Sequence, residues 1–199
     1  MRTLRIVSWA IVGLLIVAIA GALVYQSVFG GSERSMIADT KMGAPFELID
    51  HNGDPITEKS LEGQPAAIFF GFTHCPEVCP TTLYEMANWL DRLGEDGESI
   101  RAFFVTVDPE RDTPEMMKSY VENFTDRITG ITGDPEKVAE LKKAWRIYAR
   151  KVPLEDGDYT MDHTASVLLV DSQGRFKGTI AYGESSDTAV EKLRRLANG

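Results

Sequence analysis

The only two cysteines of the 199-residue chain lie close together in the stretch GFTHCPEVCPTT, residues 71–82. Three residues separate Cys75 from Cys79, whereas a C-x-x-C redox pair or a zinc knuckle has two. A chain of this length can bury a core without disulfides, so these thiols are expected to serve chemistry more than stability. Thiols in such a pattern either form a reversible disulfide or bind a soft metal ion.

The elements around the cysteines predict a binding site. Residues 66–72, AAIFFGF, form an apolar run typical of a buried strand, and residues 81–93 have the apolar periodicity of a helix. Pro80 fits the first helical position, which places Cys79 at the helix start and Cys75 in the turn before it. A helix N-terminus favours thiolates, and ligands of α/β sheets bind at the carboxyl ends of strands.

The spacing of the cysteines bears on the choice between a metal site and a disulfide. Side chains four apart on a helix have Cβ atoms about 5–6 Å apart, whereas a relaxed disulfide requires roughly 3.5–4.5 Å. A metal ion tolerates the wider separation. However, Pro76 and Pro80 restrict the backbone and can impose a turn that closes the gap. The residues alone leave both a dithiol chelate and a disulfide open.

Two thiolates leave a metal ion short of ligands, and the chain has three histidines, His51, His74 and His163. His51 lies in the turn HNGDP and is interpreted as a solvated turn residue. His74 adjoins Cys75, and neighbouring side chains of an extended segment point to opposite faces, which argues against joint ligation. His163 precedes the apolar strand TASVLLV and is either a ligand or a buried structural histidine.

The remaining patterns predict a single α/β domain. Strands are expected near residues 46–50, 101–108, 127–133 and 147–153 and twice within 162–182, and helices near 114–124, 135–145 and 187–196. Thr113 and Asp134, each followed by proline, are N-cap signals. This order predicts a thioredoxin-like mixed sheet flanked by helices, with an N-terminal β-hairpin extension.

The N-terminal segment predicts a membrane anchor. After Arg2 and Arg5, residues 6–31 carry no charge and include an apolar run long enough to span a hydrocarbon layer of roughly 30 Å. A cleaved signal peptide is the alternative, because residues 18–20, AIA, offer a processing site. The expected segments are a cytoplasmic end with a single transmembrane helix (1–31), a tether (32–42) and an exported domain (43–199).

Charge and the start of the chain indicate partners and location. Without residues 1–31 the chain carries 19 basic and 30 acidic residues, which disfavours nucleic acid and anionic lipid as partners. A basic segment followed directly by a span favours a bacterial inner membrane, with the domain in the periplasm, over a mitochondrial transit peptide.

Three stretches carry a family resemblance: GFTHCPEVCPTTL, VTVDPERDTP and DHTASVLLVD. They resemble the Sco (SenC/PrrC) family of membrane-anchored, thioredoxin-like proteins, which bind copper and assist assembly of cytochrome c oxidase. The resemblance spans residues 43–181 and implies that Cys75, Cys79 and His163 are the copper ligands. It also implies that Asp108 lies near the site, where it orients ligands or contacts a partner; a turn role is the alternative.

The chemistry of this donor set agrees with copper. Two thiolates and one imidazole favour Cu(I), and Cu(II) can gain a fourth ligand from water or a nearby oxygen. Zinc favours four ligands in a closed site, and the sequence has no second Cys/His pair to supply them. Met161, two residues before His163, is interpreted as a packing residue in preference to a soft contact.

The resemblance therefore implies a copper metallochaperone, not an enzyme, that supplies the dinuclear copper centre of an oxidase subunit. Its partners are expected to be that subunit, a copper donor and a thiol reductant that keeps the cysteines reduced. The alternative is a thiol-disulfide oxidoreductase that keeps the subunit's own cysteines reduced through Cys75 and Cys79. The three-residue spacing argues against ordinary thioredoxin activity, as does His163–Thr164 at the position of the thioredoxin cis-proline.

Overall fold

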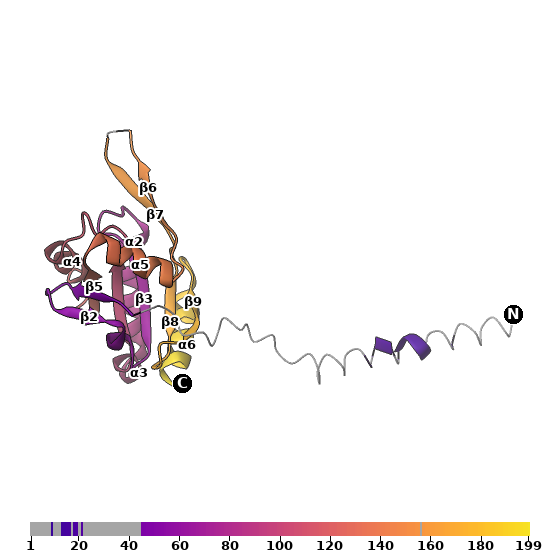
Figure 1. The fold of residues 1–199 in the computed structure, drawn as a ribbon. Coiled ribbons are helices and arrows are strands. Elements are labelled where there is room, and N and C mark those ends of the chain that lie inside the picture. Colours follow the sequence, from indigo (N-terminus) through magenta and orange to yellow (C-terminus); the bar gives the residue numbers. More distant parts are fainter. Residues whose placement is uncertain (1–8, 10–12, 17, 20, 22–44, 156) are drawn as a thin grey trace. The chain divides into compact units, whose positions relative to one another are not determined.

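The computed structural model describes residues 9, 13–16, 18, 19, 21, 45–155 and 157–199 (Figure 1). The chain divides into two units, residues 1–36 and residues 37–199, and the second carries the cysteines. Among the described residues, no helix combines the length and the apolar character that a membrane crossing requires. The predicted span and tether lie largely outside the described residues.

Nine strands and six helices make up the described part of the second unit. The strands are β1 (Glu47–Asp50), β2 (Pro55–Thr57), β3 (Ala66–Gly71), β4 (Arg101–Thr106), β5 (Ile128–Thr132), β6 (Ala149–Pro153), β7 (Tyr159–His163), β8 (Val167–Val170) and β9 (Phe176–Ile180). The helices are the 3-10 helix η1 (Glu58–Leu61) and the α-helices α2 (Val78–Leu93), α3 (Glu95–Glu98), α4 (Pro114–Val121), α5 (Pro135–Ala144) and α6 (Ser186–Ala197).

Seven strands form one mixed sheet in the order β2-β1-β5-β4-β3-β8-β9, and β6 and β7 form a separate two-stranded sheet. The parallel strands β3, β4 and β5 lie at the centre, where the apolar runs AAIFFG and RAFFVT are almost completely buried. Parallel pairing places the carboxyl ends of β3 and β4 at one edge, and the Val107 amide donates to the Gly71 carbonyl at 2.7 Å there. The two loops that follow these strands therefore lie side by side.

Helices cover both faces of the sheet. Alternate side chains of a strand point to opposite faces, so the apolar central strands have side chains to pack against helices on either side. Phe104 packs against Tyr120 of α4 on one face, with ring centroids 5.6 Å apart. On the other face, Phe70 packs against Trp145 at the end of α5, with centroids 6.0 Å apart. α6 lies against α2, where the Trp89 indole donates to the Ser186 hydroxyl at 3.3 Å. The predicted mixed sheet flanked by helices is confirmed.

The predicted helix caps are confirmed, but the start of α2 was predicted two residues too late. The Thr113 and Asp134 side chains accept backbone N–H groups of the first turns of α4 and α5. α2 begins at Val78, so Pro80 is its third residue instead of its first. A proline is tolerated there because first-turn N–H groups have no partner within the helix.

A second correction concerns the residues before β8. The sequence predicted a strand that starts near Asp162, but residues 159–163 form their own strand, β7, which pairs antiparallel with β6. β8 begins only at Val167. The β6–β7 hairpin projects from the rest of the fold in Figure 1, with His163 at its base, opposite Ala149 of β6. His163 thus belongs to the hairpin and not to the central sheet.

Candidate metal centre

Three side chains from different elements meet at the carboxyl edge of the parallel strands. Cys75 lies in the loop after β3, Cys79 lies in the first turn of α2, and His163 ends β7. Their donor atoms, the two sulfurs and a ring nitrogen, lie within 4.8 Å of one another. Cys79 is fully buried, whereas Cys75 and His163 are partly exposed. The cluster is therefore accessible to solvent from the side of these two residues.

The Cys75 sulfur caps the N-terminus of α2. The backbone N–H of Cys79 points at the Cys75 Sγ, with N and Sγ 3.4 Å apart, in a turn whose N–H groups have no partner within the helix. The aligned peptide dipoles favour negative charge at this position. A thiolate at Cys75 therefore satisfies a backbone donor that would otherwise lack a partner.

The two thiols share one proton unequally. A hydrogen bond from the Cys79 side chain, opposed by desolvation and assisted by the backbone N–H groups of Cys79 and Glu77, lowers the pKa of Cys75 to about 4. The same hydrogen bond raises the pKa of Cys79, and burial and the nearby negative charge raise it further. The reduced pair consequently carries one thiolate, on the exposed cysteine, and one thiol, on the buried one.

Hydrogen bonding fixes the tautomer of His163. Its Nδ1 lies 2.9 Å from the Thr164 carbonyl oxygen, which can only accept, so Nδ1 carries the proton. The Nε2 lone pair then faces the cluster, 3.6 Å from the Cys79 Sγ. The imidazole also packs against the Phe72 ring in a T-shaped pair, with centroids 5.7 Å apart and planes at 89°. His163 is thereby oriented as a donor through Nε2.

Gly71, the last residue of β3, leaves room for the Cys79 sulfur. A Cβ at this position would lie 2.8 Å from the Cys79 Sγ and 2.7 Å from Cε2 of Phe104, closer than such atoms approach in proteins. Only glycine allows the helix to press its buried cysteine against the strand end. The glycine that ends the strand AAIFFG thus determines how closely the Cys79 sulfur can approach the strand.

The loop after β4 surrounds the cluster with buried acidic groups. Asp112 is fully buried and accepts hydrogen bonds from the Thr73 amide, the Thr73 hydroxyl and the Thr106 hydroxyl. Burial raises the pKa of Asp112, while these donors oppose the shift. The carboxylate thereby joins the loop that carries Cys75 to the end of β4.

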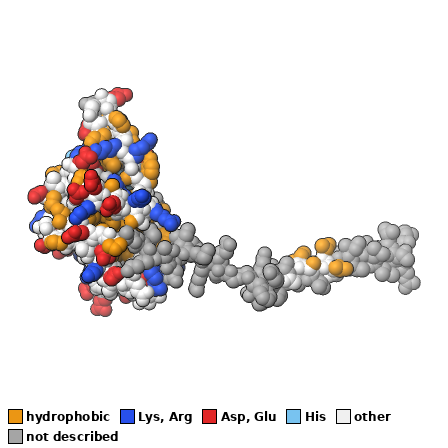
Figure 2. All heavy atoms as spheres, in the orientation of Figure 1, with side chains coloured by type: hydrophobic (Ala, Val, Ile, Leu, Met, Phe, Trp, Pro, Cys, Tyr) orange, Lys and Arg blue, Asp and Glu red, His pale blue; other side chains and the backbone are white. Residues whose placement is uncertain are grey.

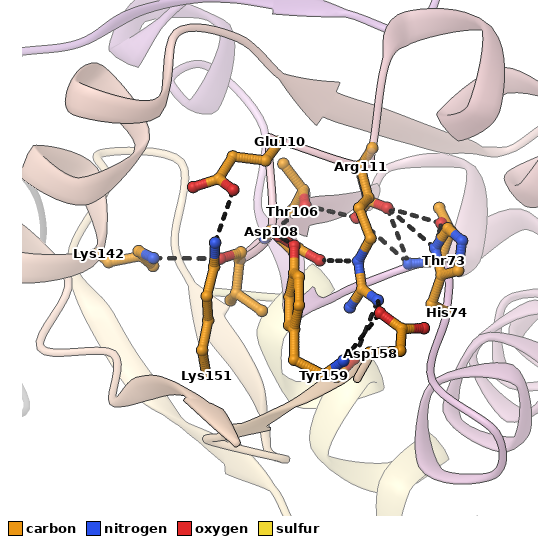
Figure 3. Close-up of polar contacts among 12 residues, drawn as sticks. Thr73, His74, Thr106, Asp108, Glu110, Arg111, Lys142, Lys151, Asp158 and Tyr159 are labelled. Atoms are coloured by element: carbon orange, nitrogen blue, oxygen red, sulfur yellow. Dashed lines mark hydrogen bonds and ion pairs between the residues drawn. The ribbon is translucent and has the colours of Figure 1, made fainter. Parts of the chain in front are cut away.

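Asp108, Arg111 and Tyr159 form a second polar group, which joins the loop after β4 to β7 (Figure 3). Asp108 is 1% exposed; it accepts a hydrogen bond from the Tyr159 hydroxyl at 2.9 Å and pairs with the Arg111 Nε at 2.5 Å. Sequence reasoning selected Asp108 but missed its two partners. The motif DPERDTP contains Arg111, so a buried ion pair could have been suspected. Tyr159, 51 residues after Asp108, gave no signal of this contact.

The other residues considered from the sequence lie outside the three-residue cluster. His74 points its Nδ1 toward the Thr73 hydroxyl, 3.0 Å away, and lies 3.9 Å from a buried carboxylate oxygen of Asp112. His51 is more than a solvated turn residue, because its Nδ1 accepts the Gly130 amide at 2.8 Å and so attaches the turn to β5. Met161 is 8% exposed and packs in the core.

The cluster fits a soft metal ion. Bonds of about 2.0–2.3 Å from one ion to a nitrogen and a sulfur place these donors roughly 3.7 Å apart at trigonal angles. The Nε2–Sγ separation of 3.6 Å matches this value, and no donor pair exceeds 4.8 Å. Two sulfurs and one imidazole are donors that suit copper, especially Cu(I). Among the described residues this is the only such group of His, Cys, Asp or Glu.

The fold and this cluster define a class: thioredoxin-like α/β proteins with a soft Cys-Cys-His metal site at the carboxyl edge of the sheet. The SCO1/SenC family model matches residues 34–198. The chain belongs to the SCO1/SenC family. An Arabidopsis thaliana mitochondrial SCO1 homologue is 37% identical over 73% of this chain and 43% of its own length. An SCO2-like protein of Rickettsia prowazekii is 37% identical over 68% of this chain and 67% of its own length.

Solved structures show the same thioredoxin-like fold. ScoI of Bradyrhizobium japonicum, a structure with copper bound, has a TM-score of 0.73 and 47% identity, and covers 78% of this chain and 99% of its own. Yeast Sco1 with copper bound has a TM-score of 0.74 and 33% identity, and covers 80% of this chain and 90% of its own. The chain spans about half the length of the plant and yeast mitochondrial relatives it matches.

The space beneath Gly71 gives a first prediction. Gly71→Ala should lower the free energy of unfolding by about 1–3 kcal/mol, because the new methyl group overpacks the contact with Cys79 and Phe104. Denaturant unfolding of the reduced chain measures the loss, and alkylation of Cys79 measures whether its sulfur has moved. Gly130→Ala is the control: its Cβ contacts His51 and Met117 at 3.3 Å, so Cys79 should stay protected. Full protection of Cys79 in Gly71→Ala would contradict the close contact.

The unequal thiols give a second prediction. With a pKa of about 4, Cys75 should be alkylated by iodoacetamide at a nearly constant rate as the pH falls from 8 to about 5, because it remains a thiolate. Mass spectrometry of the reduced, metal-free chain identifies the modified cysteine. In the Cys75→Ser control, the buried Cys79 should react slowly throughout. A rate for Cys75 that falls away below about pH 8.5, the range of an ordinary cysteine, would contradict the assignment.

Proposed function

We propose that the chain is a copper metallochaperone that assists assembly of the dinuclear copper centre of cytochrome c oxidase. Cys75, Cys79 and His163 are the proposed ligands. The observation that carries the proposal is the meeting of two sulfurs and one ring nitrogen, all within 4.8 Å, in a family with copper-bound members. The protein is an assembly factor in this proposal and not an enzyme.

The protonation of the site prepares it for a copper ion. Cys75 already carries a thiolate, and the Thr164 carbonyl holds Nδ1 of His163 so that Nε2 is oriented as a donor; the Cys79 proton has to leave when copper binds. The thiolate of Cys75 is the partly exposed donor, and it is the natural first contact for incoming copper. Three donors of this kind hold Cu(I), and Cu(II) gains a further oxygen ligand.

The same exposure allows copper to leave. A partner's sulfur can approach from the side of Cys75 and His163, whereas Cys79 is enclosed by the sheet and α2. Transfer then proceeds by exchange of one ligand at a time, and the chain regains a proton on Cys79 as copper departs. The proposed partners are the copper-binding oxidase subunit, a copper donor and a thiol reductant.

The proposed organisation places this chemistry at a membrane. Residues 1–31 form a cytoplasmic end and a single transmembrane helix, residues 32–42 a tether, and residues 43–199 the copper-binding domain in the periplasm of a bacterial inner membrane. An uncharged run of 26 residues after two arginines supports this proposal. Acidic and basic side chains are interspersed over the visible face of the described domain (Figure 2).

A second candidate function uses the same cysteines in thiol-disulfide exchange. The Cys75 thiolate attacks a disulfide of the oxidase subunit, and one sulfur of that disulfide leaves as a thiolate. Cys79 then loses its proton and attacks Cys75 in the mixed disulfide, which releases the subunit as a dithiol and leaves a Cys75–Cys79 disulfide. A thiol reductant restores the pair. A partly exposed thiolate beside a buried thiol favours this candidate.

A histidine variant separates the two candidate functions. His163→Ala should weaken Cu(I) binding by the reduced full-length chain by more than the roughly 10–100-fold that loss of an outer hydrogen-bond partner causes, because a ligand is removed. Competition with a Cu(I) chelator measures the affinity. His74→Ala is the matched control, since His74 neighbours Cys75 but lies outside the cluster.

The possible results distinguish the three-ligand copper site from thiol-disulfide exchange. Equal Cu(I) affinity of His163→Ala and the unchanged chain would exclude the three-ligand site. Loss of copper with unchanged reduction of a model disulfide would show that both chemistries use the cysteines and that only copper needs His163. An unchanged chain that takes up no copper would exclude the metallochaperone and leave thiol-disulfide exchange.

A further inference from the structure

The hairpin that carries His163 is not part of the central sheet. β6 and β7 pair only with each other among the described strands, whereas Cys75 and Cys79 follow directly from β3. No ladder of backbone hydrogen bonds therefore fixes the distance between the imidazole and the two sulfurs. Three residues, 164–166, link His163 to β8, and side-chain contacts between the hairpin and the rest of the domain also hold the imidazole in place.

Tyr159 of β7 joins the hairpin to the loop after β4 through its hydroxyl, its ring and its carbonyl. It lies on the same face of the strand as Met161 and His163, because alternate residues share a face. Met161 is buried, so this face packs against the domain. The Tyr159 ring lies between two cations, with the Arg111 guanidinium carbon 3.8 Å and the Lys151 Nζ 4.5 Å from its centroid (Figure 3).

The loop after β4 holds Tyr159 at both its side chain and its backbone. The Tyr159 hydroxyl donates to one oxygen of Asp108 at 2.9 Å, and the Arg111 Nε pairs with the other oxygen at 2.5 Å. The Arg111 Nη1 donates to the Tyr159 carbonyl at 2.9 Å. Asp108, Arg111 and Tyr159 thus form a closed ring of contacts, which we name the clasp.

The clasp is anchored firmly on the domain side. Asp108 is 1% exposed, and its amide donates to the Thr106 hydroxyl at the end of β4 at 2.9 Å. Hydrogen bonds between ionised groups in such a dry environment are shorter and stronger than neutral ones. The Lys151–Glu110 ion pair also joins the hairpin to this loop, but both of its side chains are about half exposed. Ion pairs that are this exposed contribute little to stability.

We propose that Tyr159 is a positioning residue, which acts through the clasp to hold His163 against the two cysteines. Tyr159 and His163 are the two ends of one five-residue strand, so fixing one end on the domain limits the movement of the other. The clasp thereby limits how far the His163 imidazole, the third proposed copper ligand, can move from the two sulfurs. This inference rests on the proposed copper-binding function, and it adds a residue that does not contact the metal.

The test is Tyr159→Phe in the reduced full-length chain, alone and combined with His163→Ala. The substitution keeps the ring between its cations and removes only the hydroxyl that donates to Asp108. Cu(I) affinity should fall about tenfold in the single variant, as is typical when a partner that orients a ligand is lost. With His163 already replaced, Tyr159→Phe should cause no further loss, because the effect passes through the imidazole.

A metal-free measurement separates this inference from the proposed function. The ring protons of His163 lie beside the Phe72 ring, whose current shifts their NMR frequencies. In metal-free Tyr159→Phe these resonances should move toward the values of a free histidine. Tyr148→Phe is the matched control: its hydroxyl lies 3.4 Å from Asp162 of the same hairpin, so its loss leaves the clasp intact and both readouts unchanged.

The outcomes are distinguishable. Equal loss of Cu(I) affinity with and without His163 would overturn the inference, because the effect would not pass through the imidazole. Unchanged affinity together with unchanged His163 resonances would overturn it as well. If the parent chain binds no copper, the proposed function fails, and the metal-free resonances alone then decide whether the clasp positions His163.

Discussion

The N-terminus of α2, pressed against the end of β3, is the constraint on which the site depends. The Cys75 sulfur accepts the Cys79 amide, and Gly71 removes the only side-chain atom that would keep the Cys79 sulfur away from the strand. A thiolate at this position has two effects. It accepts a hydrogen bond from a first-turn N–H group that lacks a partner within the helix, and its negative charge interacts favourably with the helix dipole. The difference between an exposed thiolate and a buried thiol follows from this geometry.

The three donors are divided between a rigid part and a projecting part of the fold. The cysteines belong to the strand–helix junction at the centre of the sheet, where β3 and β4 are almost completely buried. The imidazole arrives on a hairpin that is paired only with itself. In the proposed copper-binding function, this division would let the imidazole move away from the two sulfurs while the cysteines stay in place.

Two buried acidic side chains join segments around the cluster that are not joined by strand pairing. Asp112 joins the loop of Cys75 to β4 through threonine donors, and Asp108 joins the same region to the hairpin through Arg111 and Tyr159. Burying a carboxylate is costly unless its oxygens are satisfied, and each of these two accepts several donors. In a chain with a formal charge of −9, these two acids are structural, while most others lie at the surface.

Most of the helices and central strands, their order along the chain and the two cysteines at a strand–helix junction could be predicted from the sequence, whereas β7 and α3 could not. Local signals suffice for the predicted elements, since apolar runs, proline-marked caps and turn residues act within a few positions. Three features emerge only from the packed fold: His163 lies on a separate hairpin, its Nε2 faces Cys79, and Tyr159 reaches Asp108. These contacts join residues 84 and 51 positions apart, and their distances depend on how whole layers pack, which no local pattern encodes.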